Sequence, residues 1–239
     1  MDFRNVKSLS VGGKPVSKLF VGGRLVWKKE EPQPTGDPYV ETLGQSDSFW
    51  AAPMDQLGCV VAPAAPQHFA FSVDMRFDDG YSVAGDYGIF GFTKCNALYN
   101  QNMMSVSASD LSVYAYAPGA VLNVNGARQL VTPGARHLIK FDYDPSVGNS
   151  VDVDGSVSRQ SSTTLKMPYD TSFRFGGNAS TKSVTSVSRP VRMRVYGIKI
   201  YLAGSLVADL TPYKDGDVVG MVDAVSGRKW PGTNLLYGE

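Results

Sequence analysis

Aspartates in pairs two positions apart are the residues of this sequence best placed for acid–base chemistry. The pairs are Asp142 with Asp144, Asp152 with Asp154, and Asp215 with Asp217. Two neighbouring carboxylates can act as acid and nucleophile in the cleavage of a glycosidic bond. Each pair, however, falls at a predicted strand end or turn, where aspartate commonly caps and bends the backbone. We therefore interpret these aspartates as structural residues.

Nucleophilic catalysis finds little support. His68 and His137 are the only histidines, and no Gly-x-Ser-x-Gly sequence occurs. His137 is predicted to lie in a core-facing row as a hydrogen-bonded, partly buried residue. Cys59 and Cys95 are too few for a disulfide framework, and their spacing fits no metal motif. We interpret both as reduced core residues, with a single disulfide as the alternative.

Tyrosines are the best candidates for ligand binding. Tyr114, Tyr116 and Ser112 alternate with apolar residues, so they are predicted to share the face of a strand that points away from the core. Tyr81 and Tyr87 add aromatic side chains in loops. Flat rings beside hydrogen-bonding groups suit glycan binding. We predict a glycan-binding surface at these five residues, and cover by another segment or subunit is the equal alternative.

Short β-strands are the elements that would carry these residues. Apolar residues alternate strictly over residues 69–77, and further strands are predicted at 88–92, 111–117, 137–143, 150–155, 172–175 and 191–202. Asp154-Gly155 predicts a hairpin turn. The apolar phase changes at Gly197, which predicts a β-bulge or a bend. No helical pattern intervenes, so we expect an all-β sandwich or barrel.

The N-terminus contains a repeat with a period of ten residues. Residues 6–16 and 16–26 superpose, and each copy holds a Gly-Gly pair that accepts the backbone angles of a tight turn. We expect a ribbon of three or four short strands within residues 1–29, too small to fold alone. Residues 30–38 are polar and proline-rich, which predicts a linker. Residues 39–239 would form the main domain.

Composition and charge exclude several classes of function. The net charge of the 239 residues is +1, so binding to nucleic acid by phosphate neutralisation is not expected. No apolar stretch approaches the ~18 residues of a membrane span. The N-terminus also lacks the pattern of a signal peptide. We therefore expect synthesis in a host cytoplasm and release within a virus particle, with the virion as the location of the protein.

Four segments in the second half carry a resemblance to a known superfamily. They are residues 136–143, 151–155, 173–177 and 194–212. Together they resemble the laminin-G/concanavalin A-like lectins, which implies a two-sheet antiparallel jelly-roll sandwich. Residues 217–230, with the spacing Gly-x-x-Asp-x-x-x-Gly-x-x-aromatic, look like the tail that follows such domains in bacteriophage virion proteins. The N-terminal repeat is similar to N-terminal segments of phage tail and head-appendage proteins.

This resemblance bears on catalysis and on metal binding. Relatives that hydrolyse glucans carry Glu-x-Asp-x-Glu on one strand, but no glutamate occurs here between Glu41 and Glu239. Other relatives hold Ca²⁺ with aspartate and asparagine oxygens. Asp78, Asp79 and Asp86 are the corresponding calcium candidates, and ordinary loop polarity is the alternative explanation. No other metal or cofactor is expected.

The sequence therefore predicts a non-enzymatic bacteriophage virion structural protein that displays a lectin-like domain to host-surface glycans. Its N-terminal module would bind other virion proteins and form a homo-oligomer, for which a trimer is favoured over a dimer. One alternative is a purely architectural capsid decoration or tail component without a ligand. A glycoside hydrolase is the second alternative, which the missing glutamates disfavour.

Overall fold

A computed structural model describes residues 9–11, 14–16, 18–21, 24–28, 36–59, 68–77, 87–94, 101–106, 113–116, 134–160, 171–177, 185–187 and 190–239. These residues form strands and no helix, and every pairing among the described strands is antiparallel. The predicted all-β, antiparallel class is confirmed. The described part contains no helix long and apolar enough to cross a membrane. The chain divides into two compact units, residues 1–37 with Glu239 and residues Pro38–Gly238.

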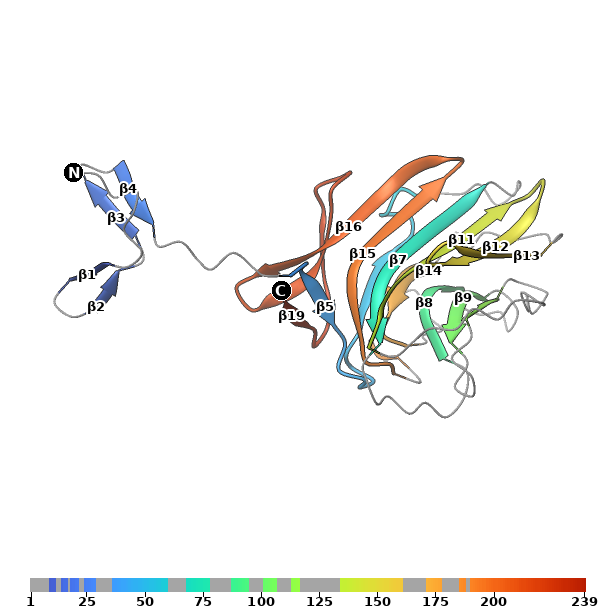
Figure 1. The fold of residues 1–239 in the computed structure, drawn as a ribbon, viewed down its shortest axis with the longest axis horizontal. Coiled ribbons are helices and arrows are strands. Elements are labelled where there is room, and N and C mark those ends of the chain that lie inside the picture. Colours follow the sequence, from blue (N-terminus) through green and yellow to red (C-terminus); the bar gives the residue numbers. More distant parts are fainter. Residues whose placement is uncertain are drawn as a thin grey trace. The chain divides into compact units, whose positions relative to one another are not determined.

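The N-terminal unit contains two separate hairpins (Figure 1). Strand β1 (Leu9–Val11) pairs with β2 (Lys14–Val16), and β3 (Lys18–Val21) pairs with β4 (Arg24–Lys28). The expectation of one ribbon of three or four strands is wrong, because β2 does not pair with β3. Each Gly-Gly pair stands between two partners, whereas the single residue between β2 and β3 is Ser17, which is too short a connection for a tight hairpin.

Five strands of the main unit form the smaller sheet, in the order β10-β9-β8-β14-β6. They are β6 (Trp50–Pro53), β8 (Tyr87–Lys94), β9 (Gln101–Val106), β10 (Val113–Tyr116) and β14 (Thr171–Phe175). The edge strand β6 ends at Pro53, which has no N–H to offer to a further strand.

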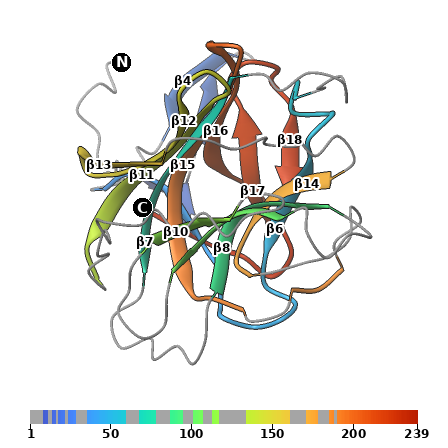
Figure 2. The same cartoon turned by 90° about the vertical axis from the view of Figure 1, so that its right-hand side faces the viewer.

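The larger sheet has ten strands. Eight of them lie side by side in the order β13-β12-β11-β7-β15-β16-β17-β18, and β5 pairs with both β15 and β19. They are β5 (Tyr39–Glu41), β7 (Phe69–Phe77), β11 (Arg136–Asp144), β12 (Gly148–Val153), β13 (Ser156–Gln160), β15 (Met193–Leu202), β16 (Ser205–Asp215), β17 (Val218–Asp223), β18 (Lys229–Pro231) and β19 (Leu236–Gly238). Figure 2 shows strands of both sheets after a 90° turn from the view of Figure 1.

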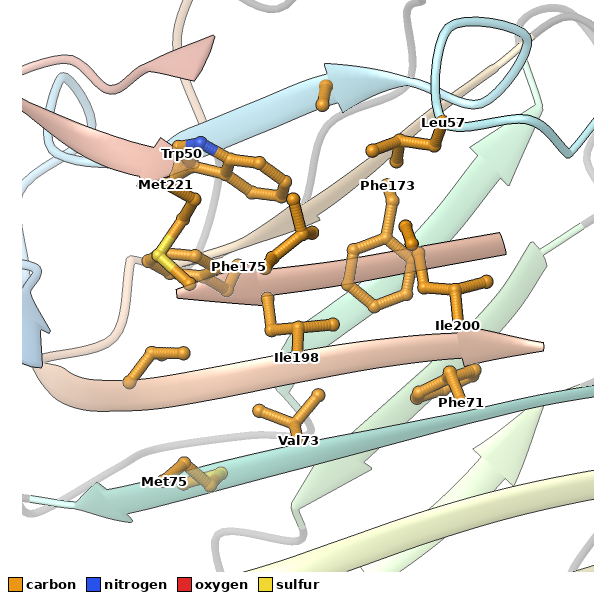
Figure 3. Close-up of a cluster of buried hydrophobic side chains, with 14 of the residues drawn as sticks. Trp50, Leu57, Phe71, Val73, Met75, Phe173, Phe175, Ile198, Ile200 and Met221 are labelled. Carbon is orange, nitrogen blue, oxygen red and sulfur yellow. The ribbon is translucent and has the colours of Figure 1, made fainter. Parts of the chain in front are cut away.

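The core lies between the two sheets. On β7 the predicted alternation is confirmed, because Phe69, Phe71, Val73 and Met75 are buried and the residues between them are not. The ring of Phe71 meets the edge of Phe173 from the smaller sheet at 5.3 Å between centroids, and both rings appear in Figure 3. Burial of each such large side chain stabilises the fold by about 1.5–3 kcal/mol.

Two local predictions from glycine positions are also confirmed. The register of β15 against β7 shifts between Val195 and Gly197, as a β-bulge requires. Val195 and Ile198 are therefore both buried although three positions separate them. At the β12–β13 hairpin, Asp154 and Gly155 have φ angles of 53° and 89°, the positive values of a type I′ turn.

Candidate functional site

The structure describes the backbone of three of the predicted tyrosines and the side chain of none of them. Tyr114 and Tyr116 lie on β10, at the edge of the smaller sheet, opposite residues of β9. Tyr87, expected in a loop, is instead the first residue of β8. The side chains of these three tyrosines lie outside the described part, as do Ser112 and Tyr81 altogether. The glycan-binding surface at these five residues stays a prediction.

The metal and thiol predictions have different outcomes. The calcium candidates Asp78, Asp79 and Asp86 lie outside the described residues, and within the described part no group of three or more His, Cys, Asp or Glu is placed to hold a metal. Cys59 is a buried free thiol, as predicted. Burial raises the pKa of this thiol to about 12, so at neutral pH it is protonated and unreactive. Cys95 lies outside the described residues.

Both histidines are bonded to aspartates. The Nδ1 atom of His137 lies 2.6 Å from Asp154 Oδ2, and its side chain is buried, as predicted for a core-facing row. His68 Nε2 lies 2.6 Å from Asp142 Oδ1 at the surface. Partial burial would raise the pKa of Asp154, but the bonds from His137 and from the Leu138 backbone N–H outweigh it and lower the pKa. Asp154 therefore stays ionised as the anchor of its turn.

Two of the remaining paired aspartates serve turns as the sequence predicts. Asp144 accepts hydrogen bonds from the backbone N–H and the hydroxyl of Ser146. Asp152 accepts the N–H of Gly155 in the β12–β13 turn at 2.6 Å. Asp215 forms an exposed ion pair with Lys229. The first two sets of contacts are local to turns, and the third joins β16 to β18 across the intervening strand β17.

Among the described residues, a group of charged and aromatic side chains gathers on the outer face of the larger sheet. This is the face that points away from the core. This outer-face cluster consists of Tyr39, Tyr196, Arg136, Arg194, Glu41 and Asp74. Its members come from β5, β15, β11 and β7, which are neighbours in the sheet. The cluster therefore joins residues that lie far apart in the sequence.

The bulge of β15 presents Tyr196 in the cluster. Val195 and Ile198 both face the core. The two residues between them, Tyr196 and Gly197, together oppose one residue of β7, Asp74. Tyr196 then projects to the outer face, where Arg136 of β11 reaches across β7 and stacks on its ring, 4.0 Å from the centroid. Asp74 of β7 holds this guanidinium from the side, through Nε and Nη2 at 2.7 Å each. Gly197 thus helps to form the site as well as the strand.

The second half of the cluster is centred on Glu41. Its side chain is 6% exposed and accepts hydrogen bonds from Arg192 at 2.8 Å and Arg194 at 3.0 Å. Arg194 also lies over the Tyr39 ring, 4.6 Å from the centroid. The Tyr39 and Tyr196 centroids are 5.6 Å apart, so the two halves are in contact.

The Glu41 carboxylate keeps the guanidinium group of Arg194 charged. Partial burial alone would lower the pKa of Arg194, but the hydrogen bond and the charge of Glu41 outweigh it and raise the pKa. A charged, planar group that is fixed on one side by a carboxylate offers its other N–H groups in a defined plane. The cluster can therefore bind a ligand that combines an apolar surface with hydrogen-bond acceptors.

The sequence predictions missed this cluster. The outward positions of residues 191–196 are Arg192, Arg194 and Tyr196, and they could be recognised because the core-facing positions of the same strand are apolar. Arg76 and Asp74 could be placed on the outward face of their strand in the same way. No pattern in the sequence, however, states that β5, β7, β11 and β15 are neighbours in this order.

The C-terminal motif proves to be a structural turn. Asp223 is buried, and its carboxylate accepts hydrogen bonds from the N–H groups of Asp209, Val225 and Ser226 at 2.8–3.1 Å and from the Ser226 hydroxyl at 2.6 Å. Gly227 has a φ angle of 72°, a conformation that favours glycine. Its N–H donates to the Asp223 carbonyl at 2.7 Å. Aspartate and glycine therefore close the connection between β17 and β18.

The other two residues of the motif join these strands to the core. A Cβ atom on Gly220 would lie 2.2 Å from the Trp230 carbonyl oxygen, so only glycine fits. The same oxygen accepts a hydrogen bond from the Trp50 indole at 3.0 Å. The motif thus fixes the edge of the larger sheet against the smaller one.

Comparison with known proteins adds distant similarities of shape only. No protein-family model matches the chain, and no curated protein matches its sequence. Similar solved structures include a Trypanosoma rangeli sialidase in complex with sialic acid, 16% identical with a TM-score of 0.40, covering 56% of this chain and 20% of the sialidase. Alginate lyase vAL-1 from Chlorella virus is 10% identical with a TM-score of 0.39, covering 69% of this chain and 84% of the lyase.

A third structure, described as a receptor binding domain, is 8% identical with a TM-score of 0.40, covering 90% of this chain and 72% of that domain. The chain spans only about a fifth of the length of the sialidase. Structural similarities with TM-scores this low do not indicate an activity for this chain.

Proposed function

We propose that the protein is a non-enzymatic structural protein of a bacteriophage virion that displays a lectin-like jelly roll for adhesion to glycans on the host surface. The phage assignment is supported by the N-terminal repeat and the segment 217–230, which are similar to segments of phage virion proteins. The antiparallel sandwich supports the lectin-like assignment, since two packed sheets are its basis.

The outer-face cluster is the observation that carries the binding role. Tyr39 and Tyr196 offer ring surface that is partly exposed, and the guanidinium groups of Arg136 and Arg194 lie over these rings. Saccharides present both C–H faces that pack on aromatic rings and oxygens that accept hydrogen bonds. Because all four side chains stand on hydrogen-bonded strands, the surface is rigid before a ligand arrives, which lowers the entropic cost of binding.

The N-terminal hairpins are proposed as the attachment to other virion proteins. Among the described strands, β1 pairs only with β2 and β3 only with β4. The outer edges of such hairpins can accept a further strand from another chain. We propose a homo-oligomer formed through this unit, with a trimer favoured over a dimer.

A purely architectural role is the second candidate, and a specific observation favours it. Cross-strand ion pairs cover much of the same outer face, as expected of a solvated wall. They join Lys140 to Asp152 at 3.4 Å and Lys199 to Asp209 at 3.2 Å. Tyr39 also packs closely against Gly238, whose added Cβ would lie 2.2 Å from the ring. The cluster would then stabilise the sheet without binding a ligand.

Hydrolysis is disfavoured on chemical grounds. Glu41 and the terminal Glu239 are the only glutamates after residue 31, and Glu41 is held by two guanidinium groups. Its carboxylate oxygens are therefore already engaged as hydrogen-bond acceptors. A polysaccharide panel assayed for reducing ends is expected to stay at background, and turnover that a single Asp→Asn change abolishes would overturn this part of the proposal.

Glycan-array and host-cell binding of the full-length protein test the adhesive function. We expect saturable binding that competes with soluble glycan, and the Tyr114→Ala, Tyr116→Ala double variant tests whether β10 contributes. If that variant folds normally and loses binding, the tyrosines predicted from the sequence take part. A wild-type protein that binds neither glycans nor host cells would exclude adhesion and leave the architectural role.

A further inference from the structure

Strand β7 carries small side chains along the middle of the outer face of the larger sheet. Ala70 and Ser72 point outward, because Phe71 between them is buried in the core. Both small residues are partly exposed. The next outward residue of β7 is Asp74, which belongs to the outer-face cluster. The outward residues from Ala70 to Asp74, here called the β7 strip, therefore continue the cluster along the strand.

Two lysines flank Ser72 and lean away from it. In the strand register Ser72 lies opposite Lys140 of β11 and opposite Lys199 of β15. Lys140 bonds to Asp152 of β12 at 3.4 Å. Lys199 bonds to Asp209 of β16 at 3.2 Å. Since β12 and β16 lie beyond β11 and β15 as seen from β7, both ammonium groups are drawn away from the strip.

An aromatic ring and a carboxylate lie on either side of Ala70. Tyr201 of β15 and Asp142 of β11 are both opposite Ala70 in the register. Tyr201 points outward and is partly exposed, because Ile200 before it is buried. The Asp142 side chain is 49% exposed and bonds to His68 through Oδ1 at 2.6 Å. A carboxylate has two oxygens, so Oδ2 can accept a further hydrogen bond.

This combination of groups suits a neutral sugar. The C–H face of a sugar ring packs on an aromatic side chain, and sugar hydroxyl groups donate short, charge-assisted hydrogen bonds to a carboxylate. The Ser72 hydroxyl, which can both donate and accept, follows two positions along the strip. Asp142 and Asp144, which are outward neighbours on β11, would repel an acidic sugar at this end.

The β7 strip is longer than one sugar ring. From Ala70 to Asp74 the strand extends about 14 Å, since each residue adds about 3.4 Å. Tyr201 lies beside one end of the strip, and Tyr196, at the bulge opposite Asp74, lies beside the other. A linear chain of sugars can therefore contact both tyrosines at once.

We infer that the β7 strip binds a linear neutral oligosaccharide, with one sugar ring against Tyr201 and its hydroxyl groups on Asp142. The chain continues past Ser72 toward the outer-face cluster. This inference rests on the proposed glycan-binding function and names the chemical class of the ligand. The cluster by itself offers contacts to one sugar, whereas the strip makes the affinity depend on the length of the chain.

Calorimetric titration of the full-length protein with sugars of different length tests the inference. The probes are linear oligosaccharides of glucose, of galactose and of mannose, from one to six units each, together with galacturonate chains of the same lengths. In at least one neutral series we expect the affinity to increase about tenfold or more from the single sugar to the longest chain. The reason is that each stacked ring and each charged hydrogen bond adds to the affinity.

Three variants locate the chain on the strip. Tyr201→Ala and Asp142→Asn are each expected to weaken binding of the longest neutral chain about fivefold. Ser72→Leu places a larger side chain on the strip and should reduce the affinity for the longest chain to that for the single sugar. Tyr213→Ala removes another outward, partly exposed tyrosine of the same sheet, on β16, and is the matched control that should leave binding unchanged. Thermal unfolding checks that each variant is folded.

The possible failures are distinguishable. Affinity that does not depend on chain length, or that all three folded variants retain, overturns the strip and leaves glycan binding by the cluster in place. Galacturonate chains that bind as tightly as every neutral series overturn the neutral class. Failure of the wild-type protein to bind any glycan overturns the proposed adhesive function and this inference together.

Discussion

Asp223 shows how one buried carboxylate can organise a turn. It accepts hydrogen bonds from three backbone N–H groups and one hydroxyl, which would otherwise be left without partners at the end of β17. Leaving buried donors unsatisfied costs about 1–3 kcal/mol each. A single side chain therefore determines whether the connection between β17 and β18 forms.

The variant Asp223→Ala is expected to lower the free energy of unfolding by about 3 kcal/mol. For a domain of this size the corresponding decrease in Tm is roughly 9 °C. Urea and thermal unfolding measure both quantities. Asp217→Ala is the control, because Asp217 is exposed in a neighbouring turn and its loss should cost less than about 0.5 kcal/mol. Equal effects of the two variants would show that the Asp223 bonds do not stabilise the turn.

The same residue makes stability depend on pH. Burial alone would raise the pKa of Asp223, but its bonds from Ser226 and from the backbone of Asp209 and Val225 outweigh burial and lower the pKa below the ordinary value of 3.8. The unfolded chain then binds more protons than the folded one, so stability increases with pH. The contribution is complete above the unfolded pKa and is lost as the pH falls through the folded pKa.

Comparison of the wild type with Asp223→Asn tests this dependence. The difference between their free energies of unfolding should be constant from pH 5 to pH 7 and should shrink as the pH falls below about 4. Urea titrations at a series of pH values measure it. A difference that stays constant down to pH 2 would mean that Asp223 does not titrate at a lowered pKa.

Within β15, the bulge at Gly197 keeps the apolar residues on both sides of it facing the core. Deletion of Gly197 would move Ile198 and Ile200 from the core to the outer face, since alternate residues of a strand face opposite sides. Exposure of two buried isoleucines costs about 4 kcal/mol or more. We expect the deletion variant to lose cooperative thermal unfolding, as followed by near-ultraviolet circular dichroism.

Gly197→Ala is the matched control for this deletion. An added Cβ would have its nearest contact at 3.5 Å from the Leu210 carbonyl oxygen, an ordinary van der Waals distance. This variant should therefore stay within about 1 kcal/mol of the wild type. If the deletion variant unfolds as cooperatively as Gly197→Ala does, β15 tolerates a change of register and the bulge is not required.

The elements that the sequence predicts well are those with local signals. Alternation places Phe71 and Val73 in the core, and the Asp154-Gly155 pair fixes a hairpin turn, because both patterns depend on neighbouring residues only. The sequence predicts a tight turn at each Gly-Gly pair, and the strands on either side of each pair do form a hairpin, but it does not predict that β2 and β3 are unpaired. A repeat of ten residues shows similarity between its copies and does not show which strands pair.

The candidate site could not be predicted in the same way. It depends on the order of strands in the larger sheet, which brings Tyr39 of β5 beside Tyr196 of β15 although they are far apart in the sequence. Strand order is decided by the packing of the whole core, since many arrangements satisfy the same alternation. Aromatic residues on a single strand were therefore easier to propose than a cluster that four strands share.

The chain consists of two units of very different size. The main unit spans Pro38–Gly238 and contains both sheets of the sandwich with the core between them. The N-terminal hairpins have two strands each, and isolated two-stranded hairpins are marginally stable in water. The sandwich should therefore fold without the N-terminal unit, whereas the N-terminal unit requires a partner.

Deletion of residues 1–37 tests this division together with the proposed role in assembly. The truncated protein is expected to unfold cooperatively at nearly the Tm of the full-length protein, because the retained part contains the buried core between the two sheets that the structure describes. Light scattering should show an oligomer for the full-length protein and a monomer for the truncated one, since the proposed pairing of hairpin edges is removed. A truncated protein that unfolds would assign the hairpins to the fold of the main unit. One that folds but keeps the oligomeric state would place the assembly surface on the sandwich, and the proposed anchoring role of the hairpins would then be wrong.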